Sequence, residues 1–481
     1  MRIFPRLLLC LLMILRPVTT LSQGTFHDLP DLGDASGKTI SPQQDQALGA
    51  EFMRQIRQEG MVRDDPEITS YLQALGQRLV LKSEDPGHSF SFFLVDEPDI
   101  NAFAGPGGYI GINAGLFLAA ETESELAGVM AHEIAHVTQR HLARAFGAAD
   151  RMSLPSAAAL LAAILIGTQD SQAGAAALTA ASAASMQYQI NFTRANEEEA
   201  DRVGIQTLAE AGLDPFGMPR FFERLQKNSR LYGTRPPEFL STHPVTTNRI
   251  AEAVSRAESY PTLKGDTGLD FQLLRVRLRV SMYNNPKQVL ADFQRYQGKP
   301  DSASPVNRYE YALLLNEAGK NTEAQAIMRE LHKEDPDRIS YRLALAGILG
   351  AGKEYSSALD VYTDTLQLYP GNVIVLLPYC STLLAADQAD KAYSILNGIT
   401  ERASDNPEIY KLLAQAARSS GHTVHTHTAM SQYYFLSGFT QQAIDQLKRA
   451  EQQPGLSDYE SARIVARIKN LELLLERSKL E

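Results

Sequence analysis

The stretch His132-Glu133-Ile134-Ala135-His136 predicts a metal-binding helix. Residues four apart on an α-helix share one face, so both imidazoles can close on a single zinc ion at about 2.0–2.1 Å. Glu133 follows the first ligand, where it can take a proton from an activated water and return it to a leaving amine. The pattern therefore predicts a zinc hydrolase; the alternative is a surface helix that carries two histidines by accident.

The residues around this stretch support the helix. Glu121, Glu123 and Glu125 come early, where carboxylates favour a helix N-terminus. An apolar stripe recurs at helical spacing and consists of Leu126, Val129, Met130, Ala131, Ile134 and Val137. The sequence thus predicts a helix that carries both the motif and a core-forming stripe.

A catalytic zinc site needs a third protein ligand and keeps its fourth position for water. The best candidates lie in the acidic stretch 196–201. If this stretch is helical, Glu197 and Asp201 share one face and Glu199 points away. One carboxylate could then bind the metal while the other hydrogen-bonds, orients or donates a proton. The alternative is an acidic, solvated helix start.

Two longer stretches, 101–116 and 123–141, resemble the edge hairpin and metal-binding helix of the M48 family of zinc metallopeptidases. The resemblance runs from about Gln43 to Arg249 and implies a zincin-like α+β domain with one Zn²⁺ per chain. Carried over to this sequence, it makes the metal ligands His132, His136 and Glu197. It also makes Glu133 the catalytic base and Asp201 the aspartate of the second helix.

The stretch Ser241-Thr242-His243-Pro244, followed by Arg249, also resembles an element of that family. His243 has two functional interpretations. It could hydrogen-bond the oxyanion of the tetrahedral intermediate, or its ring nitrogen could occupy the open zinc position and keep the enzyme latent. A histidine before proline in an ordinary loop is the third possibility.

The N-terminus predicts export. Arg2 and Arg6 precede an apolar run at 7–15 that is too short to span a bilayer and is typical of a secretory signal, with cleavage after Ser22. Its removal would leave Cys380 as the only cysteine, so no intramolecular disulfide is expected. Together with the family resemblance, this indicates a periplasmic enzyme.

Composition excludes one class of partner. The net charge of -10 argues against nucleic acid, which would require a basic face. With 44% hydrophobic and 21% charged residues, the chain is globular and long enough for two domains. The apolar stretch 154–168 is too short to cross a membrane, and we expect it to form a lid on the catalytic domain rather than a peripheral membrane contact.

After Tyr260 a 34-residue repeat begins. Small residues recur at this period in two series, Ala312, Ala346, Cys380 and Ala414, and Ala324, Ala358 and Ala392. This is similar to the tetratricopeptide repeat and predicts an α-solenoid of helical hairpins. Gly319 and Gly352 would mark turns, the register would break around Gly421 with a half repeat at Ala443 and Pro454, and a helix at 458–479 would cap the stack.

The chain is thus predicted to be mainly α. Its expected parts are a signal peptide at 1–22, a metallopeptidase domain at 23–265, bridging helices at 266–306 (271–283 and 287–296) and the solenoid at 307–481. An edge strand near Tyr109 to Ile112 would hold an unfolded substrate by strand addition.

The family resemblance further implies a role in quality control of outer-membrane protein assembly. The implied partners are unfolded or stalled outer-membrane β-barrel proteins, the barrel assembly machinery and the lipopolysaccharide translocon. The alternative from a different class is a chaperone or adaptor whose zinc site is structural or silenced by His243.

Overall fold

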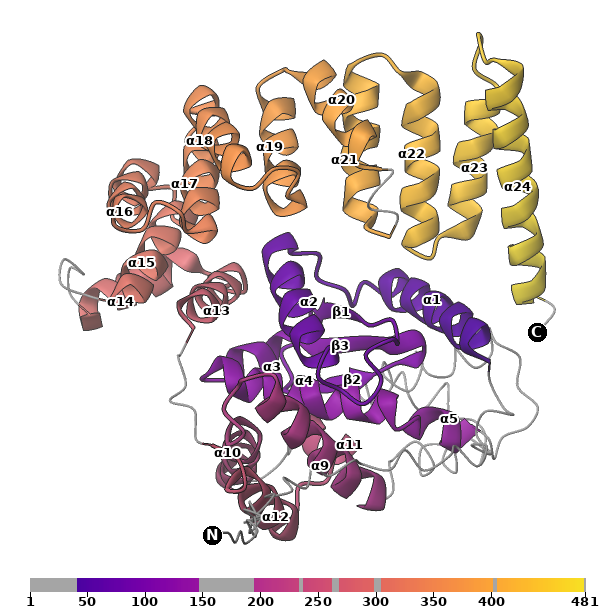
Figure 1. The fold of residues 1–481 in the computed structure, drawn as a ribbon. Helices are drawn as coiled ribbons and strands as arrows, with labels where there is room; N and C mark the ends of the chain where they lie inside the picture. The colour runs from indigo at the N-terminus through magenta and orange to yellow at the C-terminus, as the bar shows by residue number, and fades with distance from the viewer. Residues whose placement is uncertain are drawn as a thin grey trace, which may run out of the picture.

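The computed structural model describes residues 41–146, 194–232, 237–261, 268–297, 304–400 and 405–479. It consists of a lower part, in which helices surround a small sheet, and an arc of helices above it (Figure 1). The predicted signal at 1–22 and the apolar stretch at 154–168 lie outside the described residues. Among the helices that are described, none is long and apolar enough to span a membrane.

The sheet has three strands, β1 (Ser91–Val95), β2 (Ala102–Ala104) and β3 (Tyr109–Asn113). Their order is β1-β3-β2, with β3 parallel to β1 and antiparallel to β2. The predicted hairpin is present as β2 and β3. The expectation that β3 is an edge strand is wrong, because it is hydrogen-bonded to a neighbour on each side.

The two outer strands differ in what covers them. The outer side of β1 forms a bridge from Val95 to Val62, and the Gln73 side chain bonds to the backbone of Phe90 and Phe92. Such cover prevents an outer strand from pairing with another chain. The described residues add no strand to β2, which therefore provides the free edge.

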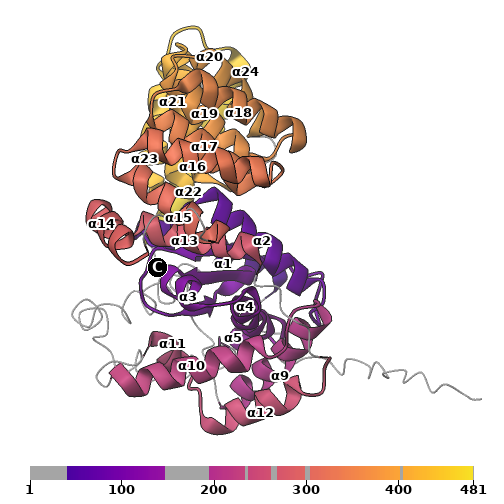
Figure 2. The same cartoon turned by 90° about the vertical axis from the view of Figure 1, so that its left-hand side faces the viewer.

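The helix that carries the motif is α4 (Glu123–Thr138). The Thr122 hydroxyl accepts from the Glu125 backbone N–H at 3.3 Å and caps the helix start. Every residue from Ser124 to His136 is buried, so burial extends beyond the predicted apolar stripe. The reason is that α4 lies between the sheet and other helices of the lower part (Figure 2).

Those other helices complete the lower part. They are α1 (Pro42–Gln58), α2 (Pro66–Val80), α3 (Ala114–Ala119), α5 (His141–Phe146), α9 (Arg194–Glu210), α10 (Gly217–Tyr232), α11 (Glu238–Thr242) and α12 (Thr247–Ala257).

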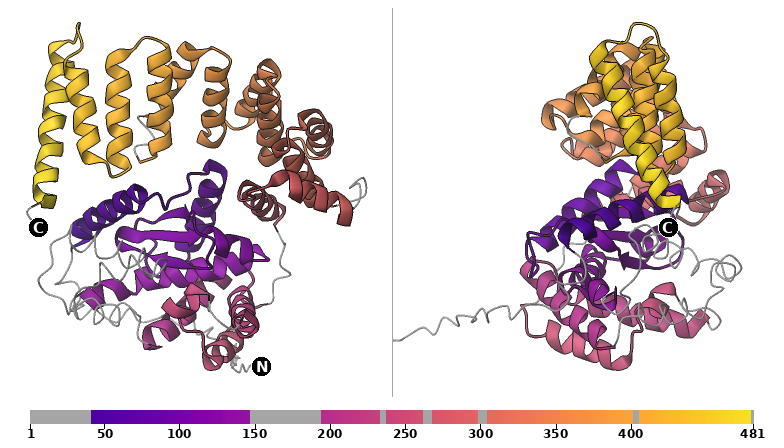
Figure 3. Two further views of the ribbon diagram at one scale, coloured as in Figure 1. Left: turned by 180° about the vertical axis from the view of Figure 1, so that it is seen from behind. Right: turned by 90° about the vertical axis from the view of Figure 1, so that its right-hand side faces the viewer.

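The arc is a stack of helices that are joined by short turns (Figure 3). Its helices are α15 (Pro305–Glu317), α16 (Asn321–Glu334), α17 (Ile339–Ala351), α18 (Tyr355–Leu368), α19 (Val373–Ala385), α20 (Ala389–Ile399), α21 (Pro407–Ser419), α22 (Thr423–Leu436), α23 (Thr440–Glu451) and α24 (Asp458–Lys479). The small residues of both predicted series are buried. The tetratricopeptide-like architecture is confirmed, and α24 ends the stack as expected.

The turns inside the first four hairpins keep the 34-residue period. Each contains one residue with positive φ, namely Gly319, Lys353, Asp387 and Gly421. The same turn, with the same pair of backbone hydrogen bonds, recurs at Gly438, only half a period after Gly421. The predicted register break is therefore confirmed, because α23 with Ala443 follows α22 as the second helix of a hairpin that comes half a period early. The second turn is centred one residue later than predicted, at Lys353, which adopts a conformation that favours glycine.

Two helices, α13 (Leu269–Ser281) and α14 (Pro286–Gln297), join the parts, as the sequence predicted. One face of α13 buries Phe271, Leu274 and Leu278 in the core of the lower part. The other face, which includes Leu273 and Val276, is buried with the first hairpins of the arc. A single helix therefore contributes to both cores.

Candidate metal centre

The site forms where α4 and α9 cross closely. A Cβ atom at Gly204 of α9 would come within 3.1 Å of the backbone nitrogen of His132, so only glycine allows this approach without a shift. The crossing brings Glu197, at the start of α9, to the two histidines of α4. The expected pairing of the two motifs is thus built by backbone contact between their helices.

Four side chains converge at this crossing. Nε2 of His132 lies 3.0 Å from Nε2 of His136, and the Glu197 oxygens lie 3.5 Å and 3.4 Å from these two nitrogens. Nδ1 of His243 lies 3.3 Å from Nε2 of His132. All four residues are buried, and their potential ligand atoms lie within 4.8 Å of one another.

These separations fit one tetrahedral metal ion. Ligand atoms bound at about 2.0–2.1 Å in a tetrahedron lie roughly 3.3–3.4 Å apart. Two imidazoles and a carboxylate are also the donors that catalytic zinc sites use. The residues present therefore fit the metal that the sequence predicted.

The surroundings set the charge of each donor. Burial and the nearby His132 lower the pKa of His136 well below its ordinary value. Burial acts against ionisation of Glu197, but His243 and His132 hold its pKa well below normal. Burial likewise disfavours charged His132, yet the hydrogen bonds that it donates to Asp201 and Glu197 raise its pKa to about 10. A metal would take the place of the His132 proton, so acid should weaken metal binding.

Glu133 lies inside the site and belongs to neither the ligand set nor an ion pair with arginine. It is fully buried, and this burial raises its pKa. One carboxylate oxygen lies 3.5 Å from Nε2 of His243, and the nearby imidazoles and the backbone of Ala104 at the end of β2 act against this rise. A raised pKa is the property expected of a group that accepts a proton and returns it.

Asp201 lies behind the donors. One carboxylate oxygen is 3.0 Å from Nδ1 of His132, on the far side of the ring from the metal centre. The same carboxylate accepts two hydrogen bonds from Arg249, at 2.7 Å and 2.8 Å. Burial opposes its ionisation, but the bonds with His132 and Arg249 lower its pKa. This arrangement fixes the orientation of the His132 ring.

Arg249 is a buried residue that links several parts of the site. The sequence had identified it only as part of a family motif. It is 2% exposed, and its guanidinium also lies 2.9 Å from Glu197 and donates to the Pro244 carbonyl at 2.8 Å. One side chain therefore neutralises two carboxylates and fixes the loop that carries His243. The centre of the Phe222 ring lies 5.4 Å from the guanidinium carbon.

The loop after α11 brings His243 over the donors. The ring stacks on Phe239, with centroids 4.8 Å apart, and Nδ1 lies 3.1 Å from each oxygen of Glu197. Sequence reasoning could not place this loop. The structure puts the histidine at the fourth corner of the donor group.

His141 is a functional candidate that sequence reasoning missed. Its Nδ1 lies 2.6 Å from Nδ1 of His136, and its Nε2 lies 3.1 Å from Glu199. Glu199 does point away from the centre, as predicted, and it supports this second histidine. The sequence offered one indication, the position of His141 five residues after His136. Its contact with His136 depends, however, on how α5 follows α4, which the sequence pattern does not give.

A hollow of about 290 Å³ adjoins the centre beside His136. Its wall includes Ala104 and Gly105 at the end of β2, with Val137 of α4 opposite. The free edge strand and the donor group therefore border the same space, which is large enough for one or two side chains of an extended peptide.

Known proteins share these features. The model of peptidase family M48 matches residues 66–257, and a tetratricopeptide repeat model matches 351–416. The beta-barrel assembly-enhancing protease of Escherichia coli K12 is 36% identical over 453 residues, which cover 94% of this chain and 92% of that one. The Vibrio cholerae protein named for the same role is 37% identical over 480 residues, 99% of each chain. The mitochondrial metalloendopeptidase OMA1 of Arabidopsis thaliana is 29% identical over 215 residues, 44% of this chain and 41% of that one.

A zincin-type helix crossed by a glutamate-bearing second helix defines a metallopeptidase. Here that catalytic part is joined to a tetratricopeptide solenoid, and the similarity to two bacterial proteases extends through both. The chain belongs to peptidase family M48.

The contact of His141 with His136 leads to a prediction. We expect His141→Leu to weaken metal binding by about 10–100-fold, because the support that selects the ring orientation of His136 is lost. Competition with a chromogenic chelator measures this affinity. His427→Gln, in α22, is the matched histidine control and should leave it unchanged. Unaltered affinity in His141→Leu would show that His136 needs no such support.

Proposed function

We propose that this chain is an exported zinc metalloendopeptidase that cleaves unfolded or misassembled outer-membrane β-barrel proteins in the periplasm. The observation that carries the proposal is the buried donor group of His132, His136 and Glu197 beside the buried carboxylate of Glu133. The cellular role is supported by similarity over nearly the whole chain to proteases named for β-barrel assembly.

A zinc ion held by His132, His136 and Glu197 would polarise a peptide carbonyl and make water a better nucleophile. Glu133 would accept the proton of that water and deliver it to the nitrogen of the leaving amine. Asp201 and Arg249 would keep His132 and Glu197 in position. The outer edge of β2, in place of β3, would hold the substrate backbone as an added strand.

Incubation of the purified full-length protein with an unfolded outer-membrane protein tests this function. We expect peptide fragments when zinc is bound stoichiometrically and none after chelation, with cleavage restored when zinc is added back. A zinc-loaded protein that cleaves no unfolded substrate, and does not do so after His243→Ala either, would favour the chaperone or adaptor function instead.

We infer that His243 caps the metal and keeps the enzyme latent. Its Nδ1 stands at ligand distance from the other donors, and the stacked Phe239 ring holds it there. An imidazole in the fourth position excludes the water needed for catalysis. Displacement of the loop by a substrate would then expose the site.

His243→Ala is therefore expected to increase cleavage of an unfolded model protein, measured as kcat/KM at saturating zinc. Ser241→Ala, an exposed change in α11 just before that loop, is the control and should have no effect. A decrease of about 10²–10³-fold would instead assign His243 to oxyanion stabilisation. No change would exclude both roles.

A further inference from the structure

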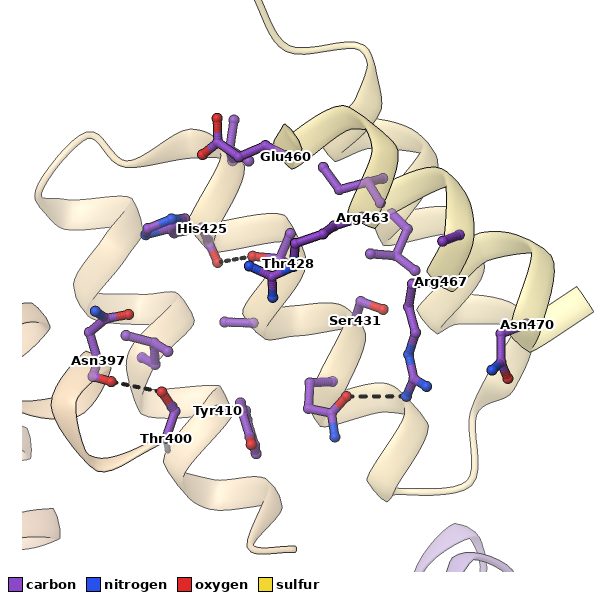
Figure 4. Close-up of a pocket in the computed structure, with 17 residues that line it drawn as sticks. Asn397, Thr400, Tyr410, His425, Thr428, Ser431, Glu460, Arg463, Arg467 and Asn470 are labelled. Atoms are coloured by element: carbon purple, nitrogen blue, oxygen red, sulfur yellow. Dashed lines mark hydrogen bonds between the residues drawn. The ribbon is translucent and has the colours of Figure 1, made fainter. Parts of the chain in front are cut away.

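A second recessed surface lies far from the metal centre, in the last hairpins of the solenoid. This groove has a volume of about 800 Å³, within the range of ligand-binding pockets. It runs between α22 and α24, with the end of α20 and part of α21 on its other side (Figure 4). Nothing in the metallopeptidase chemistry uses it.

The groove contains two arginines of α24, Arg463 and Arg467, which lie one helical turn apart. Arg467 is held at the floor. Its guanidinium carbon lies 4.7 Å from the centre of the Phe435 ring, and its Nη2 approaches the amide oxygen of Gln432 at 3.4 Å. The guanidinium is thus fixed with donors still available to a ligand.

The positive charge of Arg467 is not balanced locally. Among the described residues, no carboxylate lies within ion-pair distance of Arg463 or Arg467. Arg54 of α1, which forms an ion pair with Glu51, approaches the same Phe435 ring at 5.0 Å, and burial together with Arg54 lowers the pKa of Arg467. By contrast, Arg308 and Arg338 of the first hairpins pair with Glu334 and Asp335. A half-buried cation without a carboxylate partner favours an anionic ligand.

The acidic residue among those that line the groove, Glu460, does not neutralise Arg467. It lies nearer the opposite end, where its carboxylate accepts hydrogen bonds from the backbone and hydroxyl of Ser457. Those bonds lower its pKa. The groove is therefore positive at the Arg467 end.

The rest of the lining suits an extended peptide. Leu413, Val424, Leu447 and Ile464 provide an apolar surface. Side-chain amides of Asn397 and Asn470 lie along it and can pair with peptide backbone groups. A ligand with apolar side chains and a terminal negative charge would complement both features.

The position of α1 decides between a chain terminus and an internal acidic residue. Arg54 and Arg467 flank Phe435, and α1 lies against the turn after α22, where Gly438 has no room for a side chain next to the Arg54 carbonyl. α1 therefore borders the Arg467 end of the groove, and this position favours a peptide that ends there over one that continues.

We propose that this groove binds the C-terminal segment of an unfolded polypeptide, with its α-carboxylate on Arg467 and its last apolar side chains on the floor. Arg463 would bind a carbonyl of the same segment. The proposal rests on the proposed handling of unfolded polypeptides and needs no zinc chemistry, so binding and cleavage can fail separately.

The experiment measures fluorescence anisotropy of a labelled ten-residue peptide that ends in apolar residues. The full chain carries Glu133→Gln so that the peptide is not cut. We expect the free acid to bind at least about 10-fold more tightly than the C-terminal amide, because charge-assisted hydrogen bonds are lost in the amide. Arg467→Gln should abolish this difference, and Arg449→Gln, an exposed change in α23, should preserve it.

Three outcomes would overturn the proposal. Equal binding of acid and amide to the parent protein would exclude carboxylate recognition. A preference for the acid that survives Arg467→Gln would place the site elsewhere. If an amidated peptide with a glutamate near its end binds as tightly as the free acid, the groove recognises acidic side chains instead of a chain terminus. Circular dichroism and Arg467→Lys, which keeps the charge, separate loss of binding from loss of folding.

Discussion

Replacement of Glu133 by glutamine is expected to lower kcat/KM for peptide cleavage by about 10²–10⁴-fold, the usual contribution of a general base. Glutamine has nearly the same shape but cannot accept the proton of the attacking water. Because Glu133 is not one of the converging ligands, the metal content should stay the same. Cleavage of an unfolded protein, followed on gels, and metal analysis of the same sample test both statements.

The matched control is Glu198→Gln, since Glu198 is partly exposed and pairs with Arg194 at the surface. It should leave activity and metal content unchanged. A second consequence distinguishes a catalytic from a structural role: exchange of this fully buried carboxylate for a neutral amide of the same shape should not destabilise the fold. If Glu133→Gln stays active, another group is the base, and if it loses metal, Glu133 is a ligand.

Arg249→Met is expected to reduce the free energy of unfolding by about 3–5 kcal/mol, the scale for breaking a buried ion pair from one side. The change leaves Glu197 and Asp201 in the core without their shared cation. Urea denaturation measures the loss. It should be largest after chelation, because a bound metal ion would compensate part of the exposed carboxylate charge.

Arg256→Met on the same helix is the control. Arg256 pairs with Glu252 at the surface, and such pairs contribute about 0–1 kcal/mol. A similar small loss for Arg249→Met would mean that the two buried carboxylates are stabilised mainly by the histidines. In that case Arg249 would matter for the position of the His243 loop alone.

The parts of the site that follow local periodicity could be predicted from the sequence. The four-residue spacing of His132 and His136 determines a shared helix face, and the same holds for Glu197 and Asp201. The 34-residue recurrence of small residues predicted the hairpin stack for a similar reason, since each residue repeats one local environment. None of these inferences required knowledge of which helices cross.

The features that were missed depend on long-range contacts. The inward turn of His141, the shared role of Arg249 and the central place of β3 result from how distant segments meet. The register break after Gly421, in contrast, could be predicted, because Ala443 and Pro454 come half a period early in the sequence itself. Lys353 and Asp387 occupy the glycine position of their turns without being glycine, which hides part of the period from composition.

The helix α13, with one face in each core, has a mechanical consequence. A linker would let the solenoid swing, but a helix shared by two cores makes the solenoid a fixed arm, braced again where α1 meets α22. The span between the distal groove and the metal centre is then constant. Such an arm would act as a ruler: a polypeptide anchored at one end of it presents bonds to the catalytic centre according to their distance along the chain, whatever their side chains.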